Sequence, residues 1–473
     1  MKKLLVISLA SLLSACMVGP DYKKPDIVTP THWRNAVSNA QNTTNTQWWK
    51  QLNDPVLNRL IGQAIQGNYD LKIAIANVNQ YMGLYGSTRS NLFPQISGSF
   101  QYDHPQPKAT PNFKPNGDYV KLSGGLNWQI DLWGELRRAN EAAFAEMLAQ
   151  EATKQAVMLT LVSEVAKTYI TLRELDRQLE ITKETVATLK EGLRINTLRF
   201  KEGYISELDV QQTDSEYQRR SAQIPEYERQ IAITENALAV LLGKNPTRIE
   251  RGLNIDKLTL PSVPAGLPSD LLIRRPDIAK AEQQLIAANA QIGVARAQYF
   301  PKISLTGDIG QLSAKMASLF APGANFWTVG SAILTPIFTA GKIAGQVQAA
   351  EAVQQAALAN YKKTIIISFN EFENALVSLI KTKEQEEKQM NRVEANKNYY
   401  HLSKVRYEEG YVDYITELDA IRQLFDAQVE MTSARANTFK AAIDLYLAMG
   451  GGWIVEQEKA ANLPKPKPAP YFP

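Results

Sequence analysis

The sequence predicts an α+β membrane protein built from one structural unit that occurs twice. Three observations lead to this fold class. The stretch "RFKEGYISE" at 199–207 returns as "RYEEGYVDY" at 406–414, an offset of 207 residues. Some segments alternate apolar and polar residues with a period of two, and two helical stretches of about 64 residues contain no proline. The 473 residues carry a net charge of +4 without a cluster of basic and aromatic side chains, so nucleic-acid binding has no support.

The N-terminus has the pattern of a bacterial export signal. A positively charged start precedes an apolar run, Leu4 to Leu13, that is too short to span a bilayer as a helix. The run leads into Ser14-Ala15-Cys16, which resembles the lipoprotein signal, so we expect residues 1–15 to be removed and Cys16 to be lipidated. Position 17 is Met rather than Asp, so the usual signal for retention in the inner membrane is absent. The alternative is a plain secretory signal with a leftover cysteine. Because Cys16 is the only cysteine, the mature chain has no disulfide or thiolate metal site.

The offset of 207 holds without slippage over most of the chain. Residues 67–243 correspond to residues 274–450, with Phe93-Pro94 matching Phe300-Pro301. Each copy is longer than a solenoid repeat, so we interpret the two as a duplicated structural unit. The remaining segments are an N-terminal extended or equatorial segment, a linker that should pack around the waist, and a proline-rich equatorial tail: 16–66, 244–273 and 451–473.

Each unit begins with a helical stretch, residues 67–91 and 274–298, which a Phe-Pro pair ends. The period then changes to two. From Val120 to Leu132 apolar and polar residues alternate without a fault, and a shorter alternating run starts at Ile96. The second unit repeats both runs, the second of them more weakly. We therefore expect two amphipathic strands in each unit, with a soluble hairpin packed on helices as the alternative.

A very long helical stretch follows the strands, at residues 135–198 and 342–405. At about 1.5 Å per residue, each would be roughly 95 Å long. An "EGY" turn comes next, whose glycine suits the left-handed conformation that ends many helices. A return helix follows at residues 206–241 and 413–449, and we expect Pro225 to kink the first one. The short and return helices together match the long helix in length, so we expect them to lie end to end beside it.

Each chain therefore supplies four amphipathic strands, which are too few to close a membrane barrel. After residue 16 no run of 18 apolar residues occurs, so a bilayer crossing would require a closed β-barrel. Barrels in membranes begin at about eight strands, and an open sheet edge in lipid leaves backbone groups unpaired. If these strands meet lipid, several copies must share one wall. This argument gives an oligomer without fixing its number.

Five groups of residues carry a resemblance to the outer membrane factor (TolC-like) family, in its lipoprotein branch. They are "WWKQLNDPVLNRLIGQAIQGNYDLKIA" at 48–74, the pair "FPQIS" and "FPKIS", "IDLWGELRRA" at 130–139, "RRPDIAKAE" at 274–282 and "RYEEGYVDYITELDA" at 406–420. The resemblance implies the outer membrane channel of a tripartite efflux system, a passive exit duct for drugs or other small molecules. It implies a homotrimer whose twelve-stranded outer-membrane β-barrel, with four strands per chain, continues as a long periplasmic α-helical barrel.

The resemblance also implies partners and a location. The partners are a periplasmic adaptor (membrane fusion protein), an inner-membrane pump of the RND or MFS type, and the lipid of the bacterial outer membrane. The chain would be lipid-anchored there and extend into the periplasm. Within this family the "EGY" turns are periplasmic hairpin tips, so Gly203, Tyr204, Gly410 and Tyr411 are expected to contact the adaptor.

The family's gate lies just past the second tip. Its pattern of an apolar, an acidic and a basic residue falls on Ile415, Asp419 and Arg422, and their spacing puts them on one helix face. In a trimer each would form a ring, with a dry constriction at Ile415 and three carboxylates at Asp419 that favour cations. Tyr407 matches a position that tethers the inner hairpin to its neighbour. The alternative for Asp419 and Arg422 is an ordinary surface ion pair.

Only the second tip carries the gate carboxylate, because the offset places Gln212 opposite Asp419. We therefore expect the second hairpin to be the mobile one. The role of Glu417, an additional acidic residue near this site, stays open. Apart from a covalent lipid on Cys16 we expect no cofactor, no metal and no enzymatic activity, because the three histidines are scattered and no phosphate-binding loop occurs. The competing function is a structural coiled-coil lipoprotein of the envelope.

Overall fold

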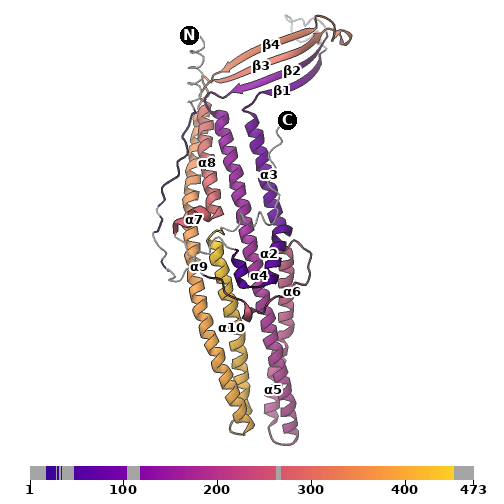
Figure 1. The fold of residues 1–473 in the computed structure, drawn as a ribbon, viewed down its shortest axis with the longest axis vertical. Coiled ribbons are helices and arrows are strands. Elements are labelled where there is room, and N and C mark those ends of the chain that lie inside the picture. Colours follow the sequence, from indigo (N-terminus) through magenta and orange to yellow (C-terminus); the bar gives the residue numbers. More distant parts are fainter. Residues whose placement is uncertain are drawn as a thin grey trace.

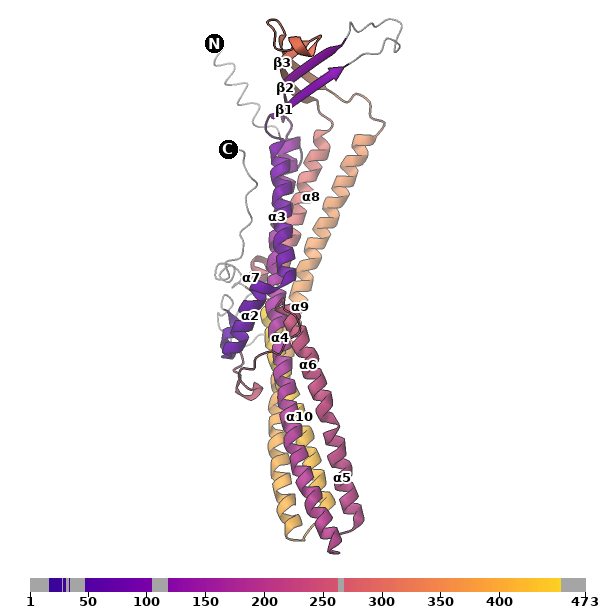
Figure 2. The same cartoon turned by 90° about the vertical axis from the view of Figure 1, so that its right-hand side faces the viewer.

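The computed structural model describes residues 17–27, 29–30, 34, 47–103, 118–262 and 268–451. The molecule is a long rod of helices with one sheet set across its upper end (Figure 1). Turning the molecule by 90° shows the helical part as a layer rather than a round bundle in its upper half (Figure 2). None of the helices in these ranges combines the length and the apolar character that a bilayer-spanning helix requires.

The elements follow the same order in the two units. The first unit contains α3 (Tyr69–Ser90), β1 (Gln95–Asp103), β2 (Tyr119–Ile130), α4 (Glu135–Lys201), α5 (Glu207–Ser221) and α6 (Gln223–Leu241). The second contains α8 (Pro276–Ala297), β3 (Lys302–Ser313), η3 (Met316–Ser318), β4 (Asn325–Leu334), α9 (Lys342–Glu408) and α10 (Tyr414–Ala448). Four further helices lie outside this pattern or at its edge: η1 (Trp48–Leu52), α2 (Pro55–Gly67), η2 (Ile255–Lys257) and α7 (Pro268–Arg274).

The four strands form one antiparallel sheet in the order β1-β2-β3-β4. Register partners share a face, and one row across the sheet joins Ile96, Leu126, Gly307 and Val329. The next row joins Ser97, Gly125, Asp308 and Thr328. Ile96 is 81% exposed and Val329 is 79% exposed, so the apolar face is uncovered in the single chain. The predicted strands, with one apolar and one polar face, are confirmed.

Two shorter helices stack to match each long one, as the lengths predicted. α3 stands above α6, and α8 stands above α10 (Figure 1). At the first junction the Asn68 side-chain amide donates to the Leu241 carbonyl at 3.1 Å, and at the second the Arg275 guanidinium donates to the Ala448 carbonyl, also at 3.1 Å. Both pairs are related by the offset of 207, so two different side chains close equivalent joints.

Three details differ from the sequence-based expectations. The long helices have 67 residues each, because they run on to Lys201 and Glu408. The N-terminal segment 16–66 is not extended throughout, since Pro55 starts the amphipathic helix α2 and Asp54 caps it by accepting from the Val56 and Leu57 N–H groups. The linker also contains a helix, α7.

The kink expected at Pro225 is confirmed as a helix break. Helix α5 ends at Ser221 and α6 begins at Gln223, whereas α10 runs through the equivalent region without interruption. Proline lacks the N–H that would continue the helical hydrogen bonds and its ring crowds the preceding turn. The first return helix therefore has a break that the second lacks.

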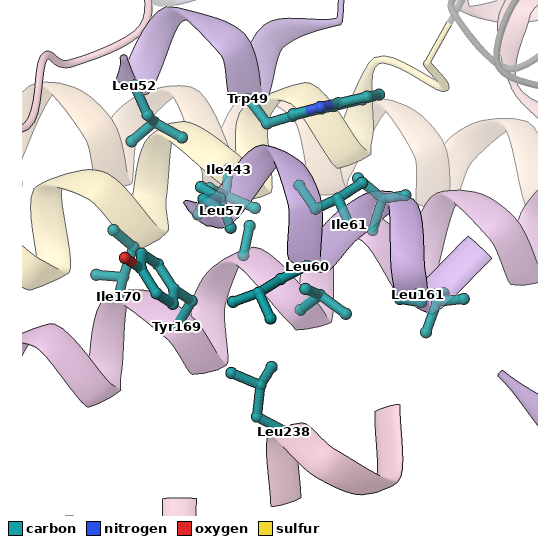
Figure 3. Close-up of a cluster of buried hydrophobic side chains, with 14 of the residues drawn as sticks. Trp49, Leu52, Leu57, Leu60, Ile61, Leu161, Tyr169, Ile170, Leu238 and Ile443 are labelled. Carbon is teal, nitrogen blue, oxygen red and sulfur yellow. The ribbon is translucent and has the colours of Figure 1, made fainter. Parts of the chain in front are cut away.

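The largest hydrophobic core lies at mid-height, where α2 packs against α4 and α10. Figure 3 shows Leu57 of α2 beside Ile443 of α10, with Ile61 of α2 in the same cluster. Asp54 is fully buried there, and its Oδ2 accepts from the Tyr169 hydroxyl at 2.7 Å and from the Leu253 N–H at 3.0 Å. This core ties the waist segments to both hairpins and leaves the two tips far from any large core.

Candidate functional site: the hairpin tips and the seam between them

The two "EGY" tips have the same backbone geometry. Gly203 and Gly410 adopt φ angles of 80° and 78°. The Tyr204 N–H donates to the Arg199 carbonyl at 2.9 Å, and the Tyr411 N–H donates to the Arg406 carbonyl at 2.8 Å. This is the Schellman arrangement, in which a left-handed glycine ends the helix.

The two tyrosines of the tips project into solvent. Tyr204 is 80% exposed and Tyr411 is 71% exposed. Gly203 and Gly410 have open space around the position of a Cβ atom, so their positive φ angles, and not crowding, select glycine. The tips lie at the end of the rod opposite the sheet (Figure 1).

The helices that leave the two tips start differently. The Ser206 side chain accepts from the Asp209 N–H and the Asp209 carboxylate accepts from the Ser206 N–H, which forms a capping box at the start of α5. Asp413 occupies the equivalent place before α10, and its side chain makes no capping hydrogen bond. Instead Tyr414, only 5% exposed, packs with Leu189 and Leu418 in a cluster between the hairpins. The start of α10 thus depends on contacts with the first hairpin.

The three predicted gate residues lie along the first turns of α10, but they form no hydrogen bond or ion pair with one another. Ile415 is 42% exposed. Asp419 accepts from the Tyr399 hydroxyl at 3.2 Å and from the Gln423 amide at 2.7 Å. Arg422 donates through Nε to Glu216 Oε2 of α5 at 2.7 Å. The surface pair between Asp419 and Arg422 is therefore not formed, and Arg422 reaches the other hairpin.

Glu216 is the centre of a buried ion network that the sequence did not point to. Its side chain is 2% exposed and also accepts from Arg219 and Arg220, each at 2.7 Å. Arg220 is 3% exposed, donates to Asp426 of α10 at 3.1 Å and lies 3.8 Å above the centre of the Phe425 ring. Burial opposes ionisation of Glu216, but the hydrogen bonds from the three arginines outweigh it and lower its pKa. We call Glu216, Arg220, Arg422 and Asp426 the hairpin latch.

Tyr407 joins the hairpins a little nearer to the tips. Its hydroxyl donates to Asn196 Oδ1 at 3.3 Å and accepts from Arg199 Nη1 at 2.9 Å, both on α4 of the same chain. Its ring lies 5.3 Å from that of Tyr414. Burial, partly offset by hydrogen bonds from its neighbours, raises the pKa of Tyr414 to about 12, so this hydroxyl stays protonated at physiological pH.

Glu417 lies half-buried in the same seam. In the part of the chain that the structure describes, it makes no ion pair or hydrogen bond. Burial raises its pKa, the Lys404 ammonium opposes that shift and the Glu408 carboxylate adds to it. Glu417 is therefore a carboxyl group placed where its charge is poorly compensated.

A groove of about 890 Å³ opens between the two tips. Four acidic side chains line it together with exposed apolar residues. The acidic residues are Asp209, Glu408, Glu409 and Asp413. Tyr204, Leu208 and Ile415 supply the apolar surface. Cys16, the predicted lipidation site, lies outside the described residues.

The fold and this site can now be compared with known proteins. The model of the outer membrane efflux protein family matches residues 60–244 and again residues 267–451. The two matches start 207 residues apart, so they reproduce the duplication found in the sequence. The chain belongs to the outer membrane efflux protein family.

Individual members of the family match over almost the whole chain. It is 35% identical over 464 residues to the toluene efflux pump outer membrane protein TtgC of Pseudomonas putida, with 96% of each chain covered. It is 30% identical to the probable outer membrane lipoprotein SilC of Salmonella typhimurium, over 96% of this chain and 99% of SilC. The Campylobacter jejuni outer membrane channel CmeC superposes with a TM-score of 0.87 at 26% identity, covering 94% of this chain and 98% of CmeC. The protein is thus an outer membrane efflux channel, and the scaffold alternative is not supported.

Proposed function

We propose that three copies of this outer membrane efflux protein form one passive duct, gated at the periplasmic hairpin tips. The observation that carries the proposal is that both the sheet and the helical layer beneath it have open edges in the single chain. The sheet ends in β1 and β4, and the layer of helices runs from α3 through α4 and α8 to α9 (Figure 1). Both edge helices carry exposed apolar side chains, such as Ile73 at 58% on α3 and Ile366 at 67% on α9.

These edges favour a ring of copies. The β4–α9 edge of one copy would meet the β1–α3 edge of the next, a head-to-tail contact that closes only if the rotation returns to its start. Closure would remove the free strand edges that lipid cannot satisfy. Native mass spectrometry of the detergent-extracted protein tests the number. We expect three copies, and a single copy without conductance in planar bilayers would overturn the proposal.

The gate would lie where the second tips meet around the axis. Ile415 would narrow the duct and Asp419 would place one carboxylate from each copy in it. The hairpin latch and Tyr407 would hold each second hairpin against its own first hairpin. Opening would then require these bonds to break or lengthen, and the uncapped start of α10 supports the second hairpin as the moving part.

The tips would bind a periplasmic adaptor that links the duct to an inner-membrane pump of the RND or MFS type. The acidic groove suits a basic residue on a helical hairpin, and the exposed Tyr204 and Tyr411 suit its apolar side chains. Cysteines placed at Tyr204 and Tyr411 test this contact by crosslinking in cells, with Tyr299 (49% exposed, near the sheet) as a matched control. Crosslinks of equal yield at all three positions would contradict it.

The duct would have no enzymatic role and no cofactor other than a lipid on Cys16. Its cargo would be drugs or other small molecules chosen by the pump, and the name of TtgC suggests that apolar solvents can belong to them. Metabolic labelling with a fatty acid, compared between the natural chain and C16S, tests the lipid directly.

A further inference from the structure

The N-terminal residues 17–24 lie in a fitted site at the base of the sheet. The Val18 N–H donates to the Trp133 carbonyl at 2.9 Å, and the Asn289 amide donates to the Pro20 carbonyl at 2.8 Å. Tyr22 and Lys24 both donate to Glu282, at 3.2 and 3.0 Å. These contacts involve α8 of the second unit and the β2–α4 joint of the first.

Two glycines make room for this segment. A Cβ atom at Gly293 would lie 2.8 Å from the Val18 carbonyl oxygen, and one at Gly19 would lie 2.5 Å from the Gly293 Cα. Gly134 has a φ angle of 82°, and a Cβ atom at this position would collide with the side chain of Met17. At Gly19 and Gly293 a Cβ atom would meet the backbone of the opposite strand of chain, so the segment and α8 approach each other at backbone distance there.

Arg138 of α4 is the charged centre of the site. Its side chain is 2% exposed and donates to Asp21 at 2.6 Å and to Glu141 at 2.8 Å. Asp21 itself is 81% exposed. A buried guanidinium needs paired acceptors, because an uncompensated charge in the interior is costly. The N-terminal segment therefore both covers Arg138 and supplies one of its two carboxylates.

The second unit shows whether an arginine at this position is needed to form the helix. The offset of 207 places Gly345 of α9 at the position of Arg138, and Gly341 at that of Gly134. α9 forms the same 67-residue helix, and nothing lies within 4 Å of a Cβ atom at either glycine. An arginine is therefore not needed to build this part of a unit. Arg138 is present only where the N-terminal segment docks.

We propose that residues 17–24 act as a clamp that holds the two units together beneath the sheet, with Arg138 as its positioning residue. The units are already linked where the helices meet the sheet: the β2–β3 ladder pairs the two units, the Trp133 indole donates to the Pro301 carbonyl at 2.8 Å, and Lys302 donates to Glu135 at 2.6 Å. The clamp adds a further crossing between the units. It also fixes Met17, the neighbour of Cys16, at the base of the sheet. If Cys16 carries the proposed lipid, anchor and sheet are held at one height.

Trypsin cleavage after Lys23 tests the clamp on the full-length, membrane-extracted protein. When reclosing is faster than cleavage, the rate reports the population of the undocked segment. We expect D21N and R138M each to accelerate cleavage by about tenfold, and the double variant to add little more because both changes break one contact. Two matched controls are R137M, whose arginine pairs with Asp131, and D26N, an exposed carboxylate outside the docking contacts. Both controls should cleave within about twofold of the parent.

Cleavage of D21N and R138M at the parent rate would overturn the proposal. If R138M fails to fold, D21N still decides, because Asp21 lies on the surface outside any helix. Heating before gel electrophoresis gives a second measurement, in which the clamp variants should dissociate at a lower temperature than the controls. The cleavage result does not depend on oligomer number or on lipidation, so it can fail or succeed independently of the proposed duct.

Discussion

The hairpin latch offers the most direct test of the proposed gate at the tips. Arg219 and Arg422 both donate to Glu216 at 2.7 Å, so replacing either one by methionine removes one arginine from the same carboxylate. Arg219 lies on α5, three residues from Glu216, whereas Arg422 lies on α10. Only R422M cuts a bond between the two hairpins, and R219M is its matched control.

The expected magnitudes follow from burial. Glu216 is 2% exposed and Arg422 is 34% exposed, so their bond belongs among charge-assisted hydrogen bonds worth about 1.5–3 kcal/mol, partly screened by solvent. We take about 2 kcal/mol, which corresponds to roughly a 30-fold change in the opening equilibrium of each chain. Arg219 is 56% exposed, and a surface pair within one helix is worth about 0.3–0.5 kcal/mol, or roughly twofold.

Single-channel recording in planar bilayers measures the difference. We expect R422M to raise the open probability strongly, while R219M stays near the parent. A double variant of R422M with E216Q should be no leakier than the more affected single variant, since both changes remove one interaction. Equal conductance of R219M and R422M would refute the latch. If Arg422 instead acts as a ring in the duct, its loss should change ion selectivity without changing the open probability.

Three further predictions concern the two hairpins. D419A removes the carboxylate that each copy would place in the proposed gate, so the duct should leak about tenfold more, whereas Q212A at the equivalent position of the first hairpin should stay closed in the same recordings. S206A should destabilise the start of α5 by about 1 kcal/mol in hydrogen exchange, and D413A should have little effect because Asp413 makes no capping bond. The pKa of Glu417 is raised in the folded protein, so its stabilising contribution is complete below about pH 4.3 and is lost as the pH rises through the folded pKa. E417Q should therefore raise the melting temperature at pH 7 and leave it unchanged near pH 4; a pH-independent effect would contradict this.

The sequence predicted the parts of the fold that depend on local pattern. Alternation gave the strands and their two faces, and proline and glycine marked the break at Pro225 and the tips at Gly203 and Gly410. The offset of 207 was enough to align the two units, because residues can be matched by position without knowing what each one does. The sequence also predicted that α3 stacks on α6, because their combined length matches that of the long helix.

The latch and the clamp could not be predicted in this way. Glu216 and Arg422 are 206 residues apart, and helical periodicity shows which side chains share a face but not which face of another helix they meet. The segment around Asp21 has neither helical nor strand periodicity, so its sequence does not predict that it docks on the helices. One signal was available for the latch: Glu216 and Arg220 form an i,i+4 pair on a helix that is otherwise rich in charges, which marks a position but not a partner.

The comparison of the two units separates what builds the fold from what operates it. Features present in both copies, such as the Schellman tips and the stacked helix joints, are required wherever the unit forms. Features present in one copy need another cause. Pro225 breaks only the first return helix, Ser206 caps only the first tip, and Arg138 meets the N-terminus only in the first unit. All three lie in the first unit, although the N-terminal segment that meets Arg138 also contacts Asn289 and Glu282 of the second unit. The second hairpin has no side-chain cap at the start of α10, and near its tip it contacts the first hairpin through Tyr407, Tyr414 and Arg422. We therefore expect the second hairpin to be the moving part of the proposed gate, and the first hairpin, whose return helix starts with a capping box, to stay fixed.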